Sequence, residues 1–460
     1  MDTMARVAAS DIKPYDDKTS NVALMATLPT PGSVVATRPI PELGVTEWTL
    51  SNGVHVVVKP TDFKADEVRI VGFADSGTSL ASDADYDSAR FASTVVGQGG
   101  LGPFDATALR KALAGKVLSV NATIAELFEI VSGIASPEDL DTLFQMVNLE
   151  LTAPRKDDGA FTAWRASQVE QAKNRRLSPE TAFHEDLSVF FSKGHRRRQP
   201  TTPEVLQSVH LEKAVAFYKA RFADASGFTF VIVGNVDLDC TKHLAETYLA
   251  SLPAAGKKER WRDVNLRHPA GVTKTSVAQG SEPKSRVSLT FHGNETWSRD
   301  AENDLRMVEE VLRIRLREIL REDMGGVYGV SVSGGVTRRP KQEYTFTVSF
   351  GCAPDNIAKL EKAVMDEIKA LQNAGVGDDY IAKVKELRRR AHETRLKENG
   401  YWVSELESAY MFGDDPKVIL DFDTMVDRVS SARVRAAAKK YLGAQYTLGE
   451  LRPASTPAAP

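Results

Sequence analysis

The sequence of 460 residues predicts an α+β fold with two related domains, each an antiparallel-rich sheet packed on helices. The chain is 42% hydrophobic and far too long for a single core, which indicates at least two domains. Strand-like segments lead into long amphipathic helices. Two pairs of segments also resemble each other at a spacing of about 220 residues, which indicates an internal duplication.

The first half of the chain begins with a strong hairpin signal. Residues 48–58 read W-T-L-S-N-G-V-H-V-V-V, in which Asn52 and Gly53 stand between runs rich in β-branched residues. Further strands are predicted at Val68–Ala74 and at 228–237. The last of these strands leads into a predicted helix, so the first half supplies both strands and helices.

Helical spacing of apolar residues is clearest in the second half, after a predicted strand at Val287–Phe291. The apolar positions that recur every three or four residues are Leu305, Val308, Leu312, Leu316 and Ile319. Arginines occupy the other faces of this helix. The remaining predicted elements are strands near Tyr328–Ser333 and Tyr344–Gly351, a helix from Asp355 to Gly375, another from near Asp379, and helices around Trp402–Met411 and Ser431–Leu442.

The internal similarity is carried by two matched pairs of segments. Residues 128–140 (F-E-I-V-S-G-I-A-S-P-E-D-L) match residues 346–357 (F-T-V-S-F-G-C-A-P-D-N-I), with one residue inserted. Residues 211–218 also match residues 432–441, with adjustment at the ends. The predicted organisation is an extended N-terminal arm at 1–43, a first domain at 44–252, a linker at 253–272, a second domain at 273–452 and a flexible tail at 453–460.

Composition excludes several classes of function. The net charge is -3, so no basic field indicates nucleic acid or an anionic membrane as a partner. No apolar run approaches the ~20 residues that span a bilayer. Cys240 and Cys352 form no CxxC motif and could pair only if the fold brings them together. The N-terminal residues contain no apolar signal region, which predicts a cytoplasmic protein, or a periplasmic one if a leader was removed.

The sequence contains no metal or nucleophile motif of its own. None of the eight histidines lies three or four residues from another, and HExxH and HxxEH are both absent. The pair His184-Glu185 is isolated beside a turn and indicates a polar surface. The stretch 97–102, G-Q-G-G-L-G, lacks the Lys-Ser/Thr ending of a phosphate-binding loop and reads as a turn. The chain is therefore not predicted to be a self-sufficient enzyme.

The segment Arg321–Tyr328, R-E-D-M-G-G-V-Y, is the strongest candidate site. A structural explanation is available for both of its ends. An arginine in the last turn of a helix complements the helix dipole. Tyr328 begins an alternating run with Val330 and Val332, so it could be a core tyrosine. The residues alone leave this explanation and a functional one open.

The chain resembles the pitrilysin–insulinase family of zinc metallopeptidases, the inverzincins, and is most similar to the non-zinc half of bacterial members. The resemblance covers roughly residues 44–452 and is carried by the Asn52-Gly53 hairpin, V-I-V-G-N-V-D at 231–237, K-S-R-V-S-L-T-F at 284–291 and residues 316–330. It implies two related α+β domains that form one half of a clamp. Two such halves close over a peptide.

The resemblance also implies a divided active site. The zinc half of the family carries HxxEH, but the corresponding window here, Asp87–Val96, contains neither histidine nor glutamate. The non-zinc half carries an arginine and a tyrosine seven residues apart, matched by Arg321 and Tyr328. We expect no metal or cofactor in this chain, zinc in an HxxEH-bearing partner subunit, and a peptide or unfolded polypeptide substrate. Arg321 and Tyr328 would bind the substrate, and Tyr328 would donate to the oxyanion.

The leading hypothesis is therefore the non-zinc subunit of a heterodimeric zinc endopeptidase, inactive alone. Two alternatives remain at this point. One is a catalytically dead scaffold of the same fold, and the other is a homodimer that binds peptides without cleaving them. Retention of the Arg321/Tyr328 pair argues against the scaffold, because a scaffold has no need of an oxyanion donor.

Overall fold

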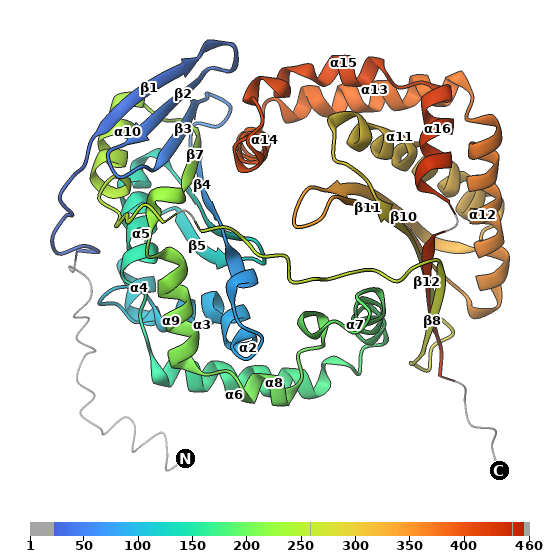
Figure 1. The fold of residues 1–460 in the computed structure, drawn as a ribbon, viewed down its shortest axis with the longest axis horizontal. Helices are drawn as coiled ribbons and strands as arrows, with labels where there is room; N and C mark the ends of the chain where they lie inside the picture. The colour runs from blue at the N-terminus through green and yellow to red at the C-terminus, as the bar shows by residue number, and fades with distance from the viewer. Residues whose placement is uncertain (1–22, 258, 444, 455–460) are drawn as a thin grey trace, which may run out of the picture.

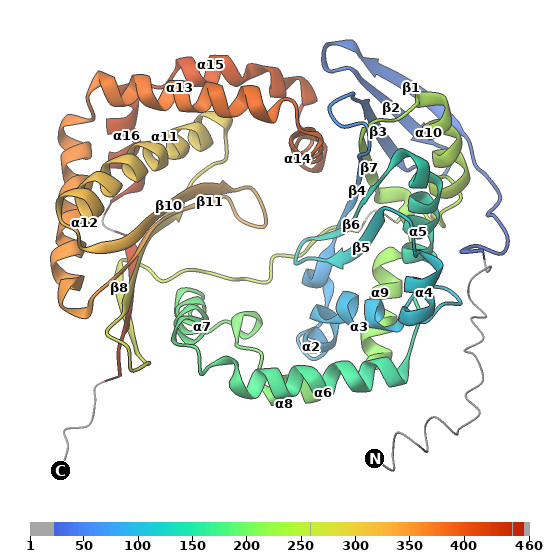
Figure 2. The same cartoon turned by 180° about the vertical axis from the view of Figure 1, so that it is seen from behind.

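The computed structural model describes residues 23–257, 259–443 and 445–454. Two lobes, each built on one sheet, face each other, and the linker between them runs across the middle of the molecule (Figures 1 and 2). Residues 1–22 of the predicted arm and 455–460 of the predicted tail lie outside the described residues. Within the described part of the chain, no helix is long and apolar enough to cross a membrane.

The first lobe contains a sheet of seven strands among the described residues. They are β1 (Val34–Ile40), β2 (Val45–Leu50), β3 (His55–Pro60), β4 (Val68–Asp75), β5 (Leu118–Ile124), β6 (Phe128–Ala135) and β7 (Thr229–Gly234). Their order is β1-β2-β3-β7-β4-β6-β5, with β3 and β7 parallel and the other pairs antiparallel. The predicted hairpin joins β2 to β3, where Gly53 takes a φ of 88°.

The second lobe contains a sheet of five strands in the described residues. They are β8 (Val272–Ala278), β9 (Ser285–Asn294), β10 (Val327–Thr337), β11 (Glu343–Cys352) and β12 (Tyr446–Arg452). Their order is β10-β11-β9-β12-β8, with β8 and β12 parallel. Reversed, this order repeats β3-β7-β4-β6-β5 of the first sheet, including its one parallel pair. The shared topology confirms the predicted duplication. The antiparallel pair β1 and β2 at the edge of the first sheet has no counterpart among the described strands of the second sheet.

Helices cover the sheets in the same sequence in both copies. The first half contributes α2 (Tyr86–Arg90), α3 (Ala92–Gly99), α4 (Ala106–Ala112), α5 (Leu140–Thr152), α6 (Asp158–Arg175), α7 (Pro179–Phe191), α8 (Pro203–Gln207), α9 (Leu211–Phe222) and α10 (Leu238–Leu244). The second contributes α11 (Arg299–Leu316), α12 (Ile357–Ala374), α13 (Asp378–Arg395), α14 (Asn399–Phe412), α15 (Phe422–Asp427) and α16 (Ser431–Tyr441). The predicted stop at Gly375 is confirmed, because this glycine caps α12 with a φ of 74°.

Each sheet has its own apolar core on one face. In the first lobe, Phe144 and Tyr218 are among the buried side chains under β4, β6 and β7. In the second lobe, Leu312, Ile368 and Tyr441 fill the corresponding position. The predicted amphipathic helix is therefore a core helix of the second lobe. This arrangement matches the α+β architecture that the sequence predicts.

The first strand, β1, lies within the segment predicted to be an extended N-terminal arm. Part of the predicted arm, Val34–Ile40, forms β1 and pairs with β2 along its length. Six of its seven residues are exposed or half-buried. The strand is held mainly by backbone pairing, so it carries no hydrophobic period that would reveal it in the sequence.

The two lobes exchange helices. Helix α14 of the second half packs on the far face of the first sheet, where Trp402 and Leu406 lie in one buried cluster with Val57 and Val231. Both ends of α14 are also held by polar contacts. Asn399 Nδ2 donates to Glu67 Oε1 at 3.1 Å, and the Tyr410 hydroxyl donates to Glu47.

Helix α7 of the first half lies against the second sheet in return. A Cβ at Gly449 of β12 would lie only 2.8 Å from Leu187 Cδ1. At the end of α7, the ring of Phe191 stacks on His268 of the linker with centroids 4.0 Å apart. The predicted boundaries therefore assign each strand to one lobe. They do not separate the helices in the same way, because each half supplies a helix to the sheet of the other.

The two cysteines are both free in this fold. Cys240 is exposed in α10, whereas Cys352 is buried at the end of β11. Burial raises the pKa of the Cys352 thiol to about 11, so this side chain behaves as a small apolar group at neutral pH. The pairing that the sequence left open does not occur.

We expect the α14 contact to contribute strongly to stability. Leu406→Ala removes a side chain that is completely buried between the lobes, and should lower the free energy of unfolding by about 2–5 kcal/mol. Leu387→Ala, at a position of α13 that is 53% exposed, is the matched control and should change it by less than about 0.5 kcal/mol. Urea unfolding of both variants measures the difference. Equal effects would contradict the proposed docking of α14.

The first lobe should also lose stability as pH rises through neutrality. Burial raises the pKa of Glu150 from 4.5 to about 7, although a hydrogen bond from the Tyr218 hydroxyl opposes the shift. The folded chain therefore holds this proton more tightly than the unfolded chain does. The resulting stabilisation, up to about 3 kcal/mol, is complete below pH 4.5 and is lost as pH rises through 7. Glu150→Gln should flatten the unfolding midpoint between pH 5 and 8, and an unchanged slope would refute the assignment.

Candidate functional site

Arg321 lies where the long helix of the second lobe ends. Helix α11 continues into a π-helical segment, η7 (Arg317–Asp323), and Arg321 is exposed in its last turn. Leu320 beside it is fully buried, which fixes the orientation of this turn. Arg321 has no hydrogen-bond or ion-pair partner in the described part of the chain. Its guanidinium group is thus available to a ligand.

The two glycines after η7 have different physical roles. Gly325 takes a φ of 58°, a left-handed conformation that lets the chain leave the helix. Gly326 donates its N–H to the carbonyl of Leu320 at 3.0 Å. A Cβ at Gly326 would lie 2.8 Å from Leu360 Cδ2, so packing against α12 favours a glycine here. This turn places Arg321 and Tyr328 on either side of one bend.

Tyr328 occupies a β-bulge at the start of β10. Val327 pairs with Cys352 and Gly329 pairs with Gly351, so Tyr328 has no pairing partner of its own on β11. A bulge re-aims the side chain of the extra residue. Tyr328 is 71% exposed, and its ring Cδ2 would lie 3.6 Å from a Cβ at Gly351. The alternative of a core tyrosine, based on alternation with Val330 and Val332, is therefore wrong.

A polar pocket of about 510 Å³ adjoins Tyr328 on the open face of the second sheet. Lys284 and Arg286 of the β9 region line it, together with Ser349 of β11 and Glu180 of α7. Lys284 pairs with Glu282, and this ion pair raises the pKa of the lysine, with a smaller contribution from Tyr328. Arg286 has no carboxylate partner within the described residues.

A second hollow of about 420 Å³ continues this face toward α7 and shares Arg286 and Ser349 with the first. Hydroxyl side chains line its floor at alternate positions of three neighbouring strands. They are Ser288, Thr290, Thr345, Thr347, Ser349 and Thr447. Such a floor offers donors and acceptors without net charge. The two hollows form a polar groove beside Tyr328.

Strand β10 is the edge strand of the second sheet. Its outer N–H and C=O groups lack a strand partner among the described residues, which makes the edge a template for an extended chain. A Cβ at Gly329 or Gly335 would meet no atom within 4 Å, so the face of the sheet is uncovered at both places. The geometry can hold an extended peptide between the edge strand, Arg321 and Tyr328.

The window that aligns with the zinc motif is filled by structural contacts. Asp87 pairs with Arg196 at 3.3 Å, and Ser93 Oγ accepts the backbone N–H of Ile124 at 2.9 Å. Ala92 and Val95 are buried in the core of the first lobe. The described residues contain no group of three His, Cys, Asp or Glu side chains that could hold a metal ion. The side chains present at the window do not fit zinc.

The sequence predicts Arg321 and Tyr328 as site residues but not the groove beside them. The alternation of polar and apolar residues in two strands could have revealed the groove. Arg286, Ser288 and Thr290 alternate with buried apolar residues, and Thr345, Thr347 and Ser349 do the same on the neighbouring strand. The register of the two strands, which places Thr347 opposite Thr290, is what joins these hydroxyls into one floor.

Comparison with known proteins finds a family model and relatives that resemble this chain. Residues 208–388 match the model of the peptidase M16 inactive domain. This part of the chain is similar to the inactive domain of M16 peptidases. A PQQL-like zinc protease of Arabidopsis thaliana is 27% identical over 416 residues, which cover 87% of this chain and 41% of the plant protein. The probable zinc protease PqqL of Haemophilus influenzae is 22% identical over 406 residues, covering 86% of this chain and 42% of the other.

The fold of this chain also matches a solved structure. The periplasmic protease PqqL from Escherichia coli superposes with a TM-score of 0.83 at 18% identity, covering 98% of this chain and 50% of that one. The chain thus spans less than half the length of the curated relatives described above. The chain is similar to zinc proteases, but its own sequence contains no HExxH or HxxEH motif.

Proposed function

We propose that this chain is the non-zinc subunit of a zinc endopeptidase and completes the active site of an HxxEH-bearing partner. The observation that carries the proposal is the exposed, bulged Tyr328 beside Arg321, at an open sheet edge. In the curated relatives, more than half of the protein lies outside the aligned segment. In our proposal a separate chain supplies the corresponding half here.

Substrate binding would use the edge of the second sheet. An extended peptide would pair with β10 through main-chain hydrogen bonds, which are largely independent of sequence. Arg321 presents a planar set of donors that suits a substrate carbonyl. The hydroxyl floor and Arg286 would contact side chains of the bound peptide. These contacts hold the scissile bond near Tyr328.

The chemical step would be shared between the subunits. The partner's zinc site supplies an activated water and polarises the scissile carbonyl. Attack of that water converts the carbonyl oxygen into an oxyanion. The Tyr328 hydroxyl, free of other partners within the described residues, would donate a hydrogen bond to this oxygen. Such a donor stabilises the transition state more than the substrate, because the negative charge develops only there.

The isolated chain should contain no stoichiometric zinc and show no peptidase activity. Addition of an HxxEH-bearing M16 half with which it associates should produce hydrolysis of a fluorogenic peptide, and chelation of zinc should abolish it. Elemental analysis and the peptide assay measure both outcomes. Stoichiometric zinc together with activity in the chain alone would overturn the division of labour.

Tyr328→Phe should lower kcat of the assembled enzyme by about 10²–10³-fold, because it removes one oxyanion donor. The unfolding midpoint and the affinity between subunits should stay unchanged, since the hydroxyl contacts no described residue. Arg321→Ala should lower kcat/KM, whereas Arg317→Ala, another exposed arginine of η7, is the matched control. Full activity of both the Tyr328 and the Arg321 variants would favour the scaffold alternative.

A further inference from the structure

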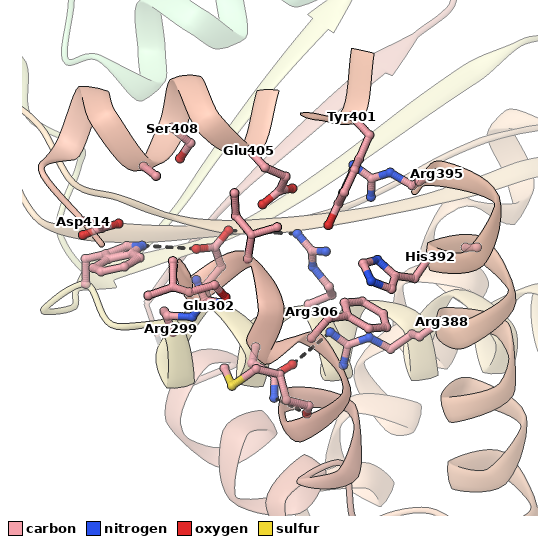
Figure 3. A pocket seen from close by; sticks show the side chains of 18 of the residues that line it. Arg299, Glu302, Arg306, Arg388, His392, Arg395, Tyr401, Glu405, Ser408 and Asp414 are labelled. Carbon is pink, nitrogen blue, oxygen red and sulfur yellow. Dashed lines mark hydrogen bonds and ion pairs between the residues drawn. The ribbon is translucent and has the colours of Figure 1, made fainter. Parts of the chain in front are cut away.

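A pocket of about 290 Å³ lies in the second lobe, lined by residues of α11, α13 and α14 and distinct from the Tyr328 groove (Figure 3). Its described lining is unusually rich in arginine. The arginines are Arg299, Arg306, Arg338, Arg388 and Arg395. Figure 3 shows Arg306, Arg388 and Arg395 near one another, with Tyr401 of α14 beside them. We call these three arginines the arginine cluster.

The other two arginines of the pocket are each held by contacts with the protein, although the buried Nε of Arg299 has no hydrogen-bond partner among the described residues. Arg338 Nη1 pairs with Asp414 at 2.7 Å, and its guanidinium lies 3.1 Å from the centroid of the Trp297 ring. Arg299 Nη2 donates to the carbonyl of Val418 at 2.7 Å. These contacts fix both side chains in the wall of the pocket. Of these two arginines, only Arg338 has a carboxylate partner within the described residues.

The charge of the arginine cluster is only partly compensated. Arg306 lies 4.0 Å from Glu302, at the limit of an ion pair. Arg395 packs over the Tyr401 ring at 4.8 Å and has no carboxylate partner within the described residues. Arg388 is 8% exposed, and its Nε is 3.7 Å from Glu310. Glu405 of α14 also interacts electrostatically with Arg395 and Arg306, so the three guanidinium groups face three carboxylates, none of them in a short ion pair.

Arg388 is the least satisfied member of the cluster. Its Nη2 donates to Asn303 Oδ1 at 2.9 Å, but its buried Nη1 has no hydrogen-bond partner among the described residues. Burial lowers the pKa of Arg388, and the nearby positive charge of Arg306 lowers it further. A buried charged donor without an acceptor is costly. An anion in the pocket would relieve this cost.

The duplicated fold provides an internal comparison. Helix α6 begins at residue 158 and α13 at residue 378, an offset of 220, and both have 18 residues. The first lobe has its own hollow of about 380 Å³ at this place. Subtracting 220 from a residue number of α13 gives the equivalent position in α6. Arg388 is then equivalent to Gln168, and His392 is equivalent to Ala172. Only Arg395 has an equivalent arginine, Arg175. The fold thus forms the hollow without needing the arginine cluster.

We propose that the pocket of the second lobe binds a small phosphate group, held by Arg306, Arg388 and Arg395. Guanidinium groups match phosphate oxygens with paired donors, which makes arginine the preferred residue for such anions. The Tyr401 hydroxyl is a further donor on the same wall. Glu405 also faces the pocket, where burial raises its pKa and the charges of Arg395 and Arg306 oppose that shift.

Binding there would couple the two lobes. Tyr401 and Glu405 line the pocket from α14, whose Trp402 and Leu406 pack on the first sheet. A phosphate bound between the arginine cluster and α14 would hold this helix to α11 and α13. The ligand would therefore stabilise the arrangement of the lobes as well as the second lobe itself.

The test uses the full chain in phosphate-free buffer, titrated with sodium phosphate and, separately, with sodium chloride at matched ionic strength. Phosphate should raise Tm by several degrees in a saturable way, and calorimetry should give one site. Glycerol 2-phosphate, tested in parallel, distinguishes free phosphate from a phosphate ester by its relative affinity. The double variant Arg306→Gln/Arg395→Gln changes exposed side chains and should weaken phosphate binding at least tenfold.

Arg175→Gln is the matched control, because it removes the corresponding arginine of the first lobe. It should bind phosphate as tightly as the unaltered chain. If the double variant fails to fold, Arg395→Gln alone serves, since this side chain has no ion pair within the described residues. An equal Tm rise in chloride, or an unchanged Kd in the folded variants of the cluster, would overturn the proposal.

Discussion

The structure depends on the reciprocal docking of α7 and α14. Each lobe has one sheet with a helical layer on one face, and the opposite face of each sheet is covered in part by a helix from the other half. The Trp402 and Leu406 side chains remove apolar surface of the first sheet from water, which is the main source of association between such layers. The polar contacts of Asn399 with Glu67 and of Tyr410 with Glu47 then fix where α14 lies. The orientation of the lobes follows from these contacts.

This docking also explains why the second sheet has an open polar groove. Its inner face carries hydroxyl side chains where the first sheet is apolar, so α7 contacts it through a few residues, such as Leu187 against Gly449. A close apolar contact at one end of the face leaves the rest accessible. The groove lies beside the bulged Tyr328 at the strand edge. A peptide-binding surface is therefore compatible with the same packing that joins the lobes.

Much of the fold could be predicted because its signals are local. The 3.6-residue period from Leu305 to Ile319, the turn at Asn52-Gly53 and the glycine stop at 375 each identify an element from neighbouring residues. The exposed strand β1 lacked such a signal, since only its pairing with β2 defines it. The exchange of helices was equally hidden, because the apolar face of α14 does not reveal which sheet covers it. For the site, the sequence identified the pair Arg321 and Tyr328, but only the bulge at Val327/Gly329 determines that Tyr328 faces outward.

The two copies of the duplicated unit differ where chemistry is expected. In the first copy, side chains of residues 87–96 pack in the core, and Asp87 forms an ion pair with Arg196. These side chains contribute to stability rather than to a ligand site. In the second copy, Tyr328, Arg321 and Arg286 have no partner of opposite charge or hydrogen-bonding capacity in the described structure, and Arg388 lacks one at Nη1. Water can satisfy the exposed side chains of Arg321 and Tyr328, whereas the buried Nη1 of Arg388 carries the full cost of an unmade hydrogen bond. Both of our proposals therefore use the second copy: the exposed pair Arg321 and Tyr328 would meet a peptide at the strand edge, and the buried Arg388 would meet an anion in the pocket.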